Sequence, residues 1–321
     1  MYVLGIETSC DETAAAVVKN GRYILSNVIS SSLKEHKKYG GIIPEVAFRS
    51  QLETIIGVVD CALKEANLKL KNIDLVAVTS GPGLTGSLLV GVSFARALSL
   101  SLGVSLLGLD HLYSHIYAGF LNKERPKLPC VALIISGGHT SLFYLEDFDR
   151  IKTLGTTSDD ACGEAFDKVA KILGLGYPGG PLIDRLARNG NPRKISFSCS
   201  NTKKPLDFSF SGIKTAVLYL VRARRLALKD KRDIAASFQE AVVETVIKKS
   251  LLACRMKKIK RLVVGGGVAA NSRLRERFYQ EAEKEGLKVY FPSIELCMDN
   301  AVMVAGLGFQ LFKKGYRPDL S

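Results

Sequence analysis

The sequence has few cysteines, and none are spaced as metal ligands or disulfide partners usually are. The seven cysteines are an odd number, lie far apart and include no C-x-x-C pair. Such a set forms neither a zinc knuckle nor a disulfide framework, and it suits a reducing cytosol. Low-complexity tracts are also missing and 47% of the residues are apolar, so the composition excludes disordered and fibrous proteins.

Targeting and membrane-spanning signals are weak. The N-terminus, MYVLGIETSC, has no basic region before its apolar run, so no signal peptide is expected. Residues 87–109 could mimic a membrane span, but Arg96 at the middle would cost roughly 2.5–3.5 kcal/mol on insertion. We therefore predict a buried helix followed by a strand, in a soluble chain.

Acidic residues are the scarcer charge. There are 31 Asp and Glu against 45 Lys and Arg, which gives a formal net charge of +14. Such a balance attracts polyanions, for example nucleic acid or an anionic membrane face. The excess is clustered, since residues 248–261 hold seven basic side chains and no acid. A solvated, lysine-rich helix face is the alternative explanation.

The order of predicted elements indicates a duplicated α/β fold. Runs rich in β-branched residues alternate with amphipathic helical stretches, and 321 residues are enough for about two domains. One order of parts occurs twice: a hairpin with a small polar turn, then a strand, a glycine-rich turn and a helix. The hairpin strands are expected at 2–8 with 14–18 and at 131–135 with 141–145; the later strands are expected at 75–79 and 262–264. Two homologous lobes explain this order, with a chance match as the alternative.

Glycine-rich turns follow both later strands. SGPGLTGS (80–87) and GGGVAAN (265–271) place glycines between a strand and a helix N-terminus. Unpaired N–H groups and the helix dipole favour a phosphate or carboxylate there. Neither turn has the Lys-Ser/Thr tail of a P-loop, and neither matches G-x-G-x-x-G. Together with the Ser-Gly-Gly turn at 136–138, they predict a phosphate-binding protein.

Two of the four histidines have the spacing of metal ligands. His111 and His115 would project from one face of a helix, which suits a divalent metal, although packed histidines are the commoner outcome. Leu112 occupies the position of the general-base Glu in zinc proteases, which counts against peptide hydrolysis. Asp299 is a candidate third ligand, and the Asp-Asn pair there could equally cap a helix.

Acidic residues also crowd the first turn of the chain, which joins the two predicted hairpin strands at 2–8 and 14–18. Glu7, Asp11 and Glu12 lie next to Cys10, where they could hold a metal or orient an attacking group. A solvated turn is the plainer reading. The segment GLGYPGGPLIDRLA (174–187) is expected to form a rigid loop that opens a helix, a backbone shape that suits close ligand approach.

These blocks together resemble the tRNA threonylcarbamoyladenosine transferase family, in its bacterial form, once labelled O-sialoglycoprotein endopeptidases. The resemblance covers nearly the whole chain. It is carried by GIETSCDET (5–13), GPGLTGSLLVG (81–91), the H-x-x-x-H pair, SGGHT (136–140), GEAFDKVAK with LGLGYPGGP (163–181), FSFSGIKT (208–215), GGVAAN (266–271) and MDNA (298–301).

The resemblance implies a fold and an activity. The fold is that of actin, the sugar kinases and the heat-shock-70 ATPases, an α/β fold with two lobes, each a ribonuclease-H-like mixed sheet flanked by helices. The lobes are expected at 1–110 plus 300–321 and at 111–299, the second with tRNA-side and substrate-side insertions. The implied activity moves a threonylcarbamoyl group from threonylcarbamoyl-adenylate to N6 of adenosine 37, in tRNAs that read ANN codons. The implied location is the cytoplasm.

The resemblance also implies ligands and partners. One divalent metal is expected on His111, His115 and Asp299, with iron as the first choice and zinc or magnesium as alternatives. The adenylate, or ATP, is expected to contact a second set of residues: Ile134, Ile135, Ser136, Gly137, Gly138, Asp167, Gly180, Asp184 and Asn271. Expected partners are tRNA, an inactive paralogue as heterodimer partner, a small P-loop ATPase and the upstream synthase that makes the adenylate, with no membrane.

The chemistry itself calls for a base. The adenine amine is a poor nucleophile, so a nearby carboxylate, Asp11 or Glu12, is the candidate that accepts its proton. Three other functions stay open: a small-molecule kinase of the same fold, a non-catalytic scaffold in an RNA-associated complex, and a protease. The GEAFDK and YPGGP blocks and the H-x-x-x-H pair argue against the kinase.

Overall fold

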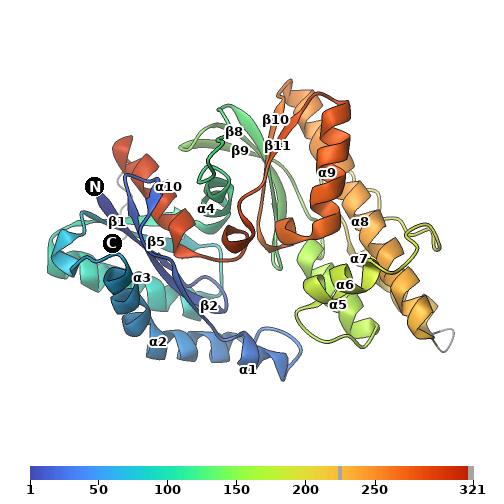
Figure 1. Cartoon of the computed structure of the whole chain (residues 1–321), viewed down its shortest axis with the longest axis horizontal. Helices are drawn as coiled ribbons and strands as arrows, with labels where there is room; N and C mark the ends of the chain where they lie inside the picture. The colour runs from blue at the N-terminus through green and yellow to red at the C-terminus, as the bar shows by residue number, and fades with distance from the viewer. Residues whose placement is uncertain (223–225, 317–321) are drawn as a thin grey trace. The chain divides into compact units, whose positions relative to one another are not determined.

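The computed structural model describes residues 1–222 and 226–316, which form two compact units (Figure 1). The first unit contains Met1–Glu124 and the segment from Pro292 onward, and the second contains Arg125–Phe291. The sequence predicts two functional lobes, 1–110 with 300–321 and 111–299, and these boundaries stay a prediction. The last residues of the predicted first lobe, 317–321, lie outside the described part of the chain.

The first unit is built on a six-stranded mixed sheet. Its path runs β3-β2-β1-β5-β6, and β4 pairs with β2. The strands are β1 (Tyr2–Glu7), β2 (Glu12–Lys19), β3 (Tyr23–Ile24), β4 (Val28–Ser31), β5 (Leu75–Gly81) and β6 (Ser105–Asp110). β1 and β2 form an antiparallel hairpin, whereas β5 and β6 run parallel to β1. The parallel strands therefore all end at the same edge of the sheet.

Helices cover both faces of this sheet. They are α1 (Leu33–Lys37), α2 (Pro44–Glu65), α3 (Thr85–Leu102), α4 (His111–Ala118) and α10 (Ala301–Lys313). Alternating side chains of β1 explain the layers: Leu4 and Ile6 join the core under α2 and α3, and Gly5 faces α10. The α10 helix also packs on α4.

The second unit repeats the strand order of the first. Its five-stranded sheet has the order β11-β10-β7-β8-β9, in which β7 and β8 form the hairpin and β10 and β11 run parallel to β7. The strands are β7 (Cys130–Ile135), β8 (Thr140–Asp147), β9 (Arg150–Thr156), β10 (Arg261–Gly265) and β11 (Lys288–Tyr290). The helices are α5 (Cys162–Ile172), α6 (Gly179–Ala187), α7 (Ser211–Arg222), α8 (Leu228–Lys257) and α9 (Ser272–Lys284). The predicted duplication of an α/β fold is confirmed.

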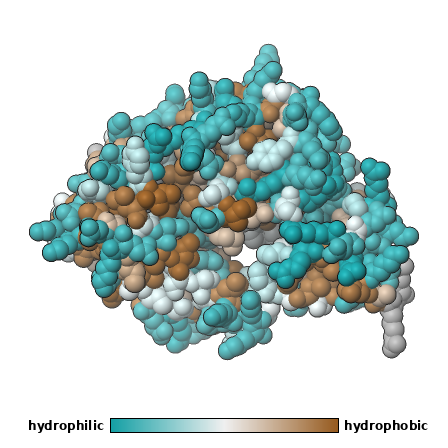
Figure 2. Space-filling model, viewed as in Figure 1, coloured by the Kyte–Doolittle hydropathy of each residue, from teal (hydrophilic) through white to brown (hydrophobic). Residues whose placement is uncertain are grey.

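The apolar stretch at 87–109 forms a helix and a strand, as predicted, but the helix is not buried all round. One face of α3 packs on β5, and the other leaves Leu89 and Leu100 61% and 76% exposed. Figure 2 shows hydrophobic surface over the region where α3 lies. Among the described residues, α3 is the one helix long and apolar enough to cross a membrane, a test that helices of soluble proteins also pass.

The fold predicts a steric difference between two glycines. A Cβ at Gly5 would collide with the carbonyl oxygen of Ala301 and the backbone nitrogen of Ala305, whereas a Cβ at Gly57, within α2, would meet nothing. We expect Gly5→Ala to lower the free energy of unfolding by about 1–3 kcal/mol. Gly57→Ala should raise it by about 0.5–1 kcal/mol, because alanine is the better helix former. Urea unfolding of both variants checks this, and equal shifts would contradict it.

Candidate active site

The two histidines lie at the start of a helix that begins where β6 ends. Asp110 caps this helix, α4, since its Oδ1 accepts hydrogen bonds from the backbone N–H groups of Leu112 (2.8 Å) and Tyr113 (3.0 Å). The four-residue spacing then puts both imidazoles on one face, with ring centroids 4.6 Å apart. His111 is 5% exposed and His115 is completely buried.

Asp299 reaches the same place from the other end of the chain. Its Oδ1 lies 2.9 Å from Nε2 of His115 and 3.7 Å from Nε2 of His111. The helix α10 that follows is capped by Asn300, whose side chain accepts a hydrogen bond from the N–H of Met303. Asn300 therefore does the capping, and the carboxylate of Asp299 is left to face the histidines.

The cluster suits a divalent metal. One ligand atom from each of His111, His115 and Asp299 lies within 4.8 Å of the other two. Two imidazole nitrogens and a carboxylate are a donor set that zinc and non-haem iron both accept, whereas magnesium prefers oxygen ligands. The structure thus brings together the three residues predicted as ligands.

Buried carboxylates set the electrostatics around these histidines. Burial works to lower the pKa of His111, but the carboxylates of Asp299 and Glu7 raise it to about 9. Burial also acts to raise the pKa of Glu7, and the charge and hydrogen bond of His111 bring it below its ordinary value. For Glu12, burial and then the carboxylates of Asp299 and Asp11 raise the pKa well above its usual range. This excess of negative charge favours a bound cation.

The first turn packs against the first glycine-rich turn. The N–H of Leu84 donates to the carbonyl of Ser9 (2.8 Å), and the hydroxyl of Ser87 donates to the carbonyl of Cys10 (3.2 Å). Asp11 is 8% exposed and Glu12 opens β2, half-buried. The two candidate bases are therefore held in a packed turn and not in a solvated one.

The predicted adenylate residues all lie in the second unit, and several contact one another. Asp167 of α5 accepts the N–H of Gly179 at 2.6 Å and also that of Gly180, so it caps α6. Asp184 of α6 accepts the hydroxyl of Ser272 at 2.9 Å. Burial raises the pKa of Asp167 above its ordinary value, despite these hydrogen bonds.

Asn271 and the Ser-Gly-Gly turn complete this set. Asn271 caps α9 through a hydrogen bond from the N–H of Leu274, and its amide donates to Oε1 of Gln239 at 2.8 Å. The turn at 136–138 joins β7 to β8, with exposed glycines. Ile134 and Ile135 are fully buried in β7, so only their backbone groups can reach a ligand.

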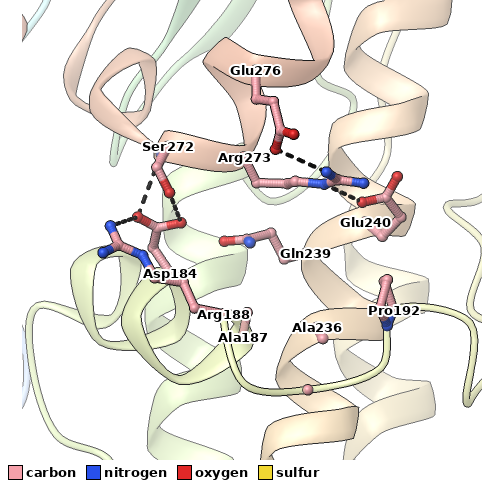
Figure 3. Close-up of a pocket in the computed structure, with 11 residues that line it drawn as sticks. Asp184, Ala187, Arg188, Pro192, Ala236, Gln239, Glu240, Ser272, Arg273 and Glu276 are labelled. Carbon is pink, nitrogen blue, oxygen red and sulfur yellow. Dashed lines mark hydrogen bonds and ion pairs between the residues drawn. The ribbon is translucent and has the colours of Figure 1, made fainter.

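A pocket of about 310 Å³ opens beside Asp184 (Figure 3). It is lined by Asp184, Ala187, Arg188, Gly190, Pro192, Ala236, Gln239, Glu240, Ser272, Arg273 and Glu276. Arg273 donates to Glu240 and to Glu276 across one wall. Of these residues the sequence predicted only Asp184. The others lie on α6, α8 and α9 or, as with Arg188, Gly190 and Pro192, directly after α6, and no sequence motif marks them because the pocket forms where these segments pack together.

The strand order and the clustered ligands define the class: a two-lobed α/β protein of the actin-like ATPase fold. Solved structures agree on the fold. Component A of Acidaminococcus fermentans (R)-2-hydroxyglutaryl-CoA dehydratase has a TM-score of 0.59 at 19% identity, over 98% of this chain and 100% of that one. HypF of T. kodakarensis has a TM-score of 0.63 at 17% identity, over 98% of this chain and 48% of that one.

Sequence comparison places the chain in a family. The profile of tRNA N6-adenosine threonylcarbamoyltransferase matches residues 23–306. Proteins of that name from Dictyoglomus turgidum and Thermodesulfovibrio yellowstonii are 50% and 52% identical to it, over 100% of this chain and 96% and 97% of theirs. The chain belongs to the tRNA N6-adenosine threonylcarbamoyltransferase family, as the resemblance of its motifs predicted.

The histidine cluster generates a prediction about metal binding. Protein carrying His111→Ala and His115→Ala should lose its bound divalent ion, because two of three ligands are gone. His139→Ala, which changes a histidine of the second unit, should keep it. Metal content after dialysis, with Zn²⁺ and Fe²⁺ titrations, measures both variants. Wild-type stoichiometry in the double variant would rule this cluster out as the metal site.

Proposed function

We propose that this protein transfers the threonylcarbamoyl group of threonylcarbamoyl-adenylate to N6 of adenosine 37, in tRNAs that read ANN codons. The observation that carries the proposal is the full-length match, near 50% identity, to relatives named for this activity. The grouping of His111, His115 and Asp299, the three residues that the family resemblance assigns to a metal, supports the proposal.

The second unit would hold the adenylate. This substrate is a mixed carbamic–phosphoric anhydride and is already activated, so the protein has to position it and stabilise charge on the leaving phosphate. Backbone N–H groups of the 136–138 turn and the N-terminus of α6 at Gly180 suit an anionic group. The carboxylate of Asp184 and the amide of Asn271 offer an acceptor and a donor for the nucleoside hydroxyls and base.

The first unit would hold the metal and the base. A divalent ion on His111, His115 and Asp299 would supply Lewis-acid stabilisation of phosphate charge. The donor set favours iron or zinc over magnesium. The adenine N6 attacks the carbamoyl carbon, the bond to the phosphate oxygen breaks, AMP leaves, and the proton of the amine passes to a carboxylate. Asp11 and Glu12 are the carboxylates of this unit that we assign to that proton.

Partners follow from the family and from exposed surface. Within 248–261, Lys249, Arg255 and Arg261 contact other parts of the second unit, so the residues left exposed for RNA phosphates include Lys248, Lys258 and Lys260. Such contacts make affinity fall steeply with salt.

The outer faces of α2 and α3 suit a protein partner. Leu52 and Ile56 of α2 and Leu89 and Leu100 of α3 are 58–76% exposed. An apolar surface of this kind favours an interface, and we assign it to the inactive paralogue. A small P-loop ATPase, the adenylate-forming synthase and a cytoplasmic location complete the proposal.

The decisive experiment is reconstitution of the modification. Protein, partners, unmodified tRNA, labelled threonine, bicarbonate, ATP and the adenylate-forming enzyme should yield labelled tRNA, and the His111→Ala/His115→Ala protein should yield none. Label that survives the double substitution would keep the function and remove the metal assignment. No label, together with ATP turnover on a small molecule, would identify a kinase instead.

The base assignment predicts a defect in the chemical step. Asp11→Asn or Glu12→Gln should slow single-turnover transfer by about 10²–10⁴-fold, the usual contribution of a positioned base. Glu53→Gln, an exposed position on α2, is the matched control and should react at the wild-type rate. Near wild-type single-turnover rates in both Asp11→Asn and Glu12→Gln would remove the assignment.

A further inference from the structure

Glu7 is a fully buried carboxylate at the end of β1. Burying such a group is costly unless it is hydrogen-bonded. Its Oε1 accepts the N–H of Ser9 at 2.6 Å, and its Oε2 accepts the hydroxyl of Thr79 at 2.5 Å and lies 3.2 Å from Nδ1 of His111. The carboxylate thus joins the first turn, β5 and α4 at one point.

The contact with His111 determines which ring nitrogen carries a proton. An ionised carboxylate can only accept hydrogen bonds, so Nδ1 of His111 must be the donor. When the imidazole is neutral, its Nε2 then has a free lone pair. Nε2 is the atom that faces Oδ1 of Asp299 at 3.7 Å, within the metal cluster.

Ser9 is the other group near this nitrogen. Its hydroxyl lies 3.1 Å from Nδ1 of His111, but a hydroxyl can donate or accept and therefore selects neither tautomer. His115 has no corresponding partner, because its buried Nδ1 makes no hydrogen bond with the described residues. His115 is held through its other ring nitrogen, since its Nε2 lies 2.9 Å from Oδ1 of Asp299, so among the two histidines a carboxylate contact at Nδ1 belongs to His111.

We propose that Glu7 is a positioning residue of the metal site, which accepts the Nδ1–H of His111 and so presents Nε2 to the ion. The inference rests on the metal site of the proposed function. Glu7 contacts the ring nitrogen remote from Asp299, so it acts through His111 and is not itself a ligand. Carboxylate–histidine–metal pairs of this kind typically strengthen metal binding by about 10–100-fold.

The test is the metal affinity of Glu7→Gln, measured by Zn²⁺ titration without tRNA or adenylate. Glutamine keeps the shape, but its NH₂ group can donate to Nδ1 and would move the imidazole proton to Nε2, where it blocks the ligand. We expect affinity to fall about 10–100-fold. The visible spectrum of bound Co²⁺ should change as well, because the orientation of one ligand is no longer fixed.

Two variants separate this role from a purely structural one. Thr79→Val removes a different hydrogen bond of the same carboxylate, so it should cost stability and leave the Zn²⁺ affinity and the Co²⁺ spectrum at wild type. Ser9→Ala leaves Glu7 as the partner of Nδ1 and should also retain affinity. Thermal unfolding of each variant shows whether it folds.

Several outcomes would overturn the proposal. Wild-type metal affinity in folded Glu7→Gln would do so, and so would a loss of affinity in Thr79→Val equal to that in Glu7→Gln. A tenfold loss of affinity in Ser9→Ala would also overturn it, and this variant decides the test if Glu7→Gln does not fold. A wild-type protein that binds no divalent ion would overturn it too. Metal binding with the expected losses, but without tRNA labelling, would refute the proposed transferase and leave the role of Glu7 intact.

Discussion

The candidate metal cluster depends on the close approach of α10 to β1 in the first unit. The approach is possible because Gly5 has no side chain where the backbone of Ala301 and Ala305 passes. On the next turn Gly306 lies against the ring of Tyr117, which brings α10 onto α4 as well. Because α10 packs this closely on β1 and α4, its N-terminus is fixed. The carboxylate of Asp299, which lies just before that N-terminus, is fixed with it.

The packing of α10 on β1 and α4 also has an electrostatic consequence. Glu7, Asp299 and the two histidines occupy a site with little exposure to water, where charges interact strongly and an unpaired one is costly. Hydrogen bonds from Ser9 and Thr79 compensate Glu7, and the histidines compensate Asp299. The first unit therefore collects negative charge around imidazole nitrogens, an arrangement suited to a cation.

The second unit uses the same strand order for different chemistry. The turns after its strands carry backbone N–H groups and capped helix starts: Asp167 of α5 caps α6, and Asn271 caps α9. This unit contains no histidine pair. The repeated sheet supplies a common edge at which turns gather, while the side chains in those turns decide what is bound. Long helices such as α8 fill the second unit and bring Gln239 to Asn271.

Much of this was determined by the sequence alone. Periodicity and glycine-rich turns sufficed to predict the duplicated α/β fold, and the motifs sufficed to predict the family. The four-residue spacing sufficed to predict that His111 and His115 share a helix face. All three depend on residues that are near neighbours along the chain. The sequence named Asp299 as a candidate ligand but left open whether it caps a helix instead. Only the tertiary structure decided that Asp299 faces the histidines while Asn300 caps α10, that Glu7 contacts His111, and that α3 keeps one apolar face exposed. Those outcomes depend on which segments pack together across 100 to 190 residues of chain, and local patterns carry no record of that.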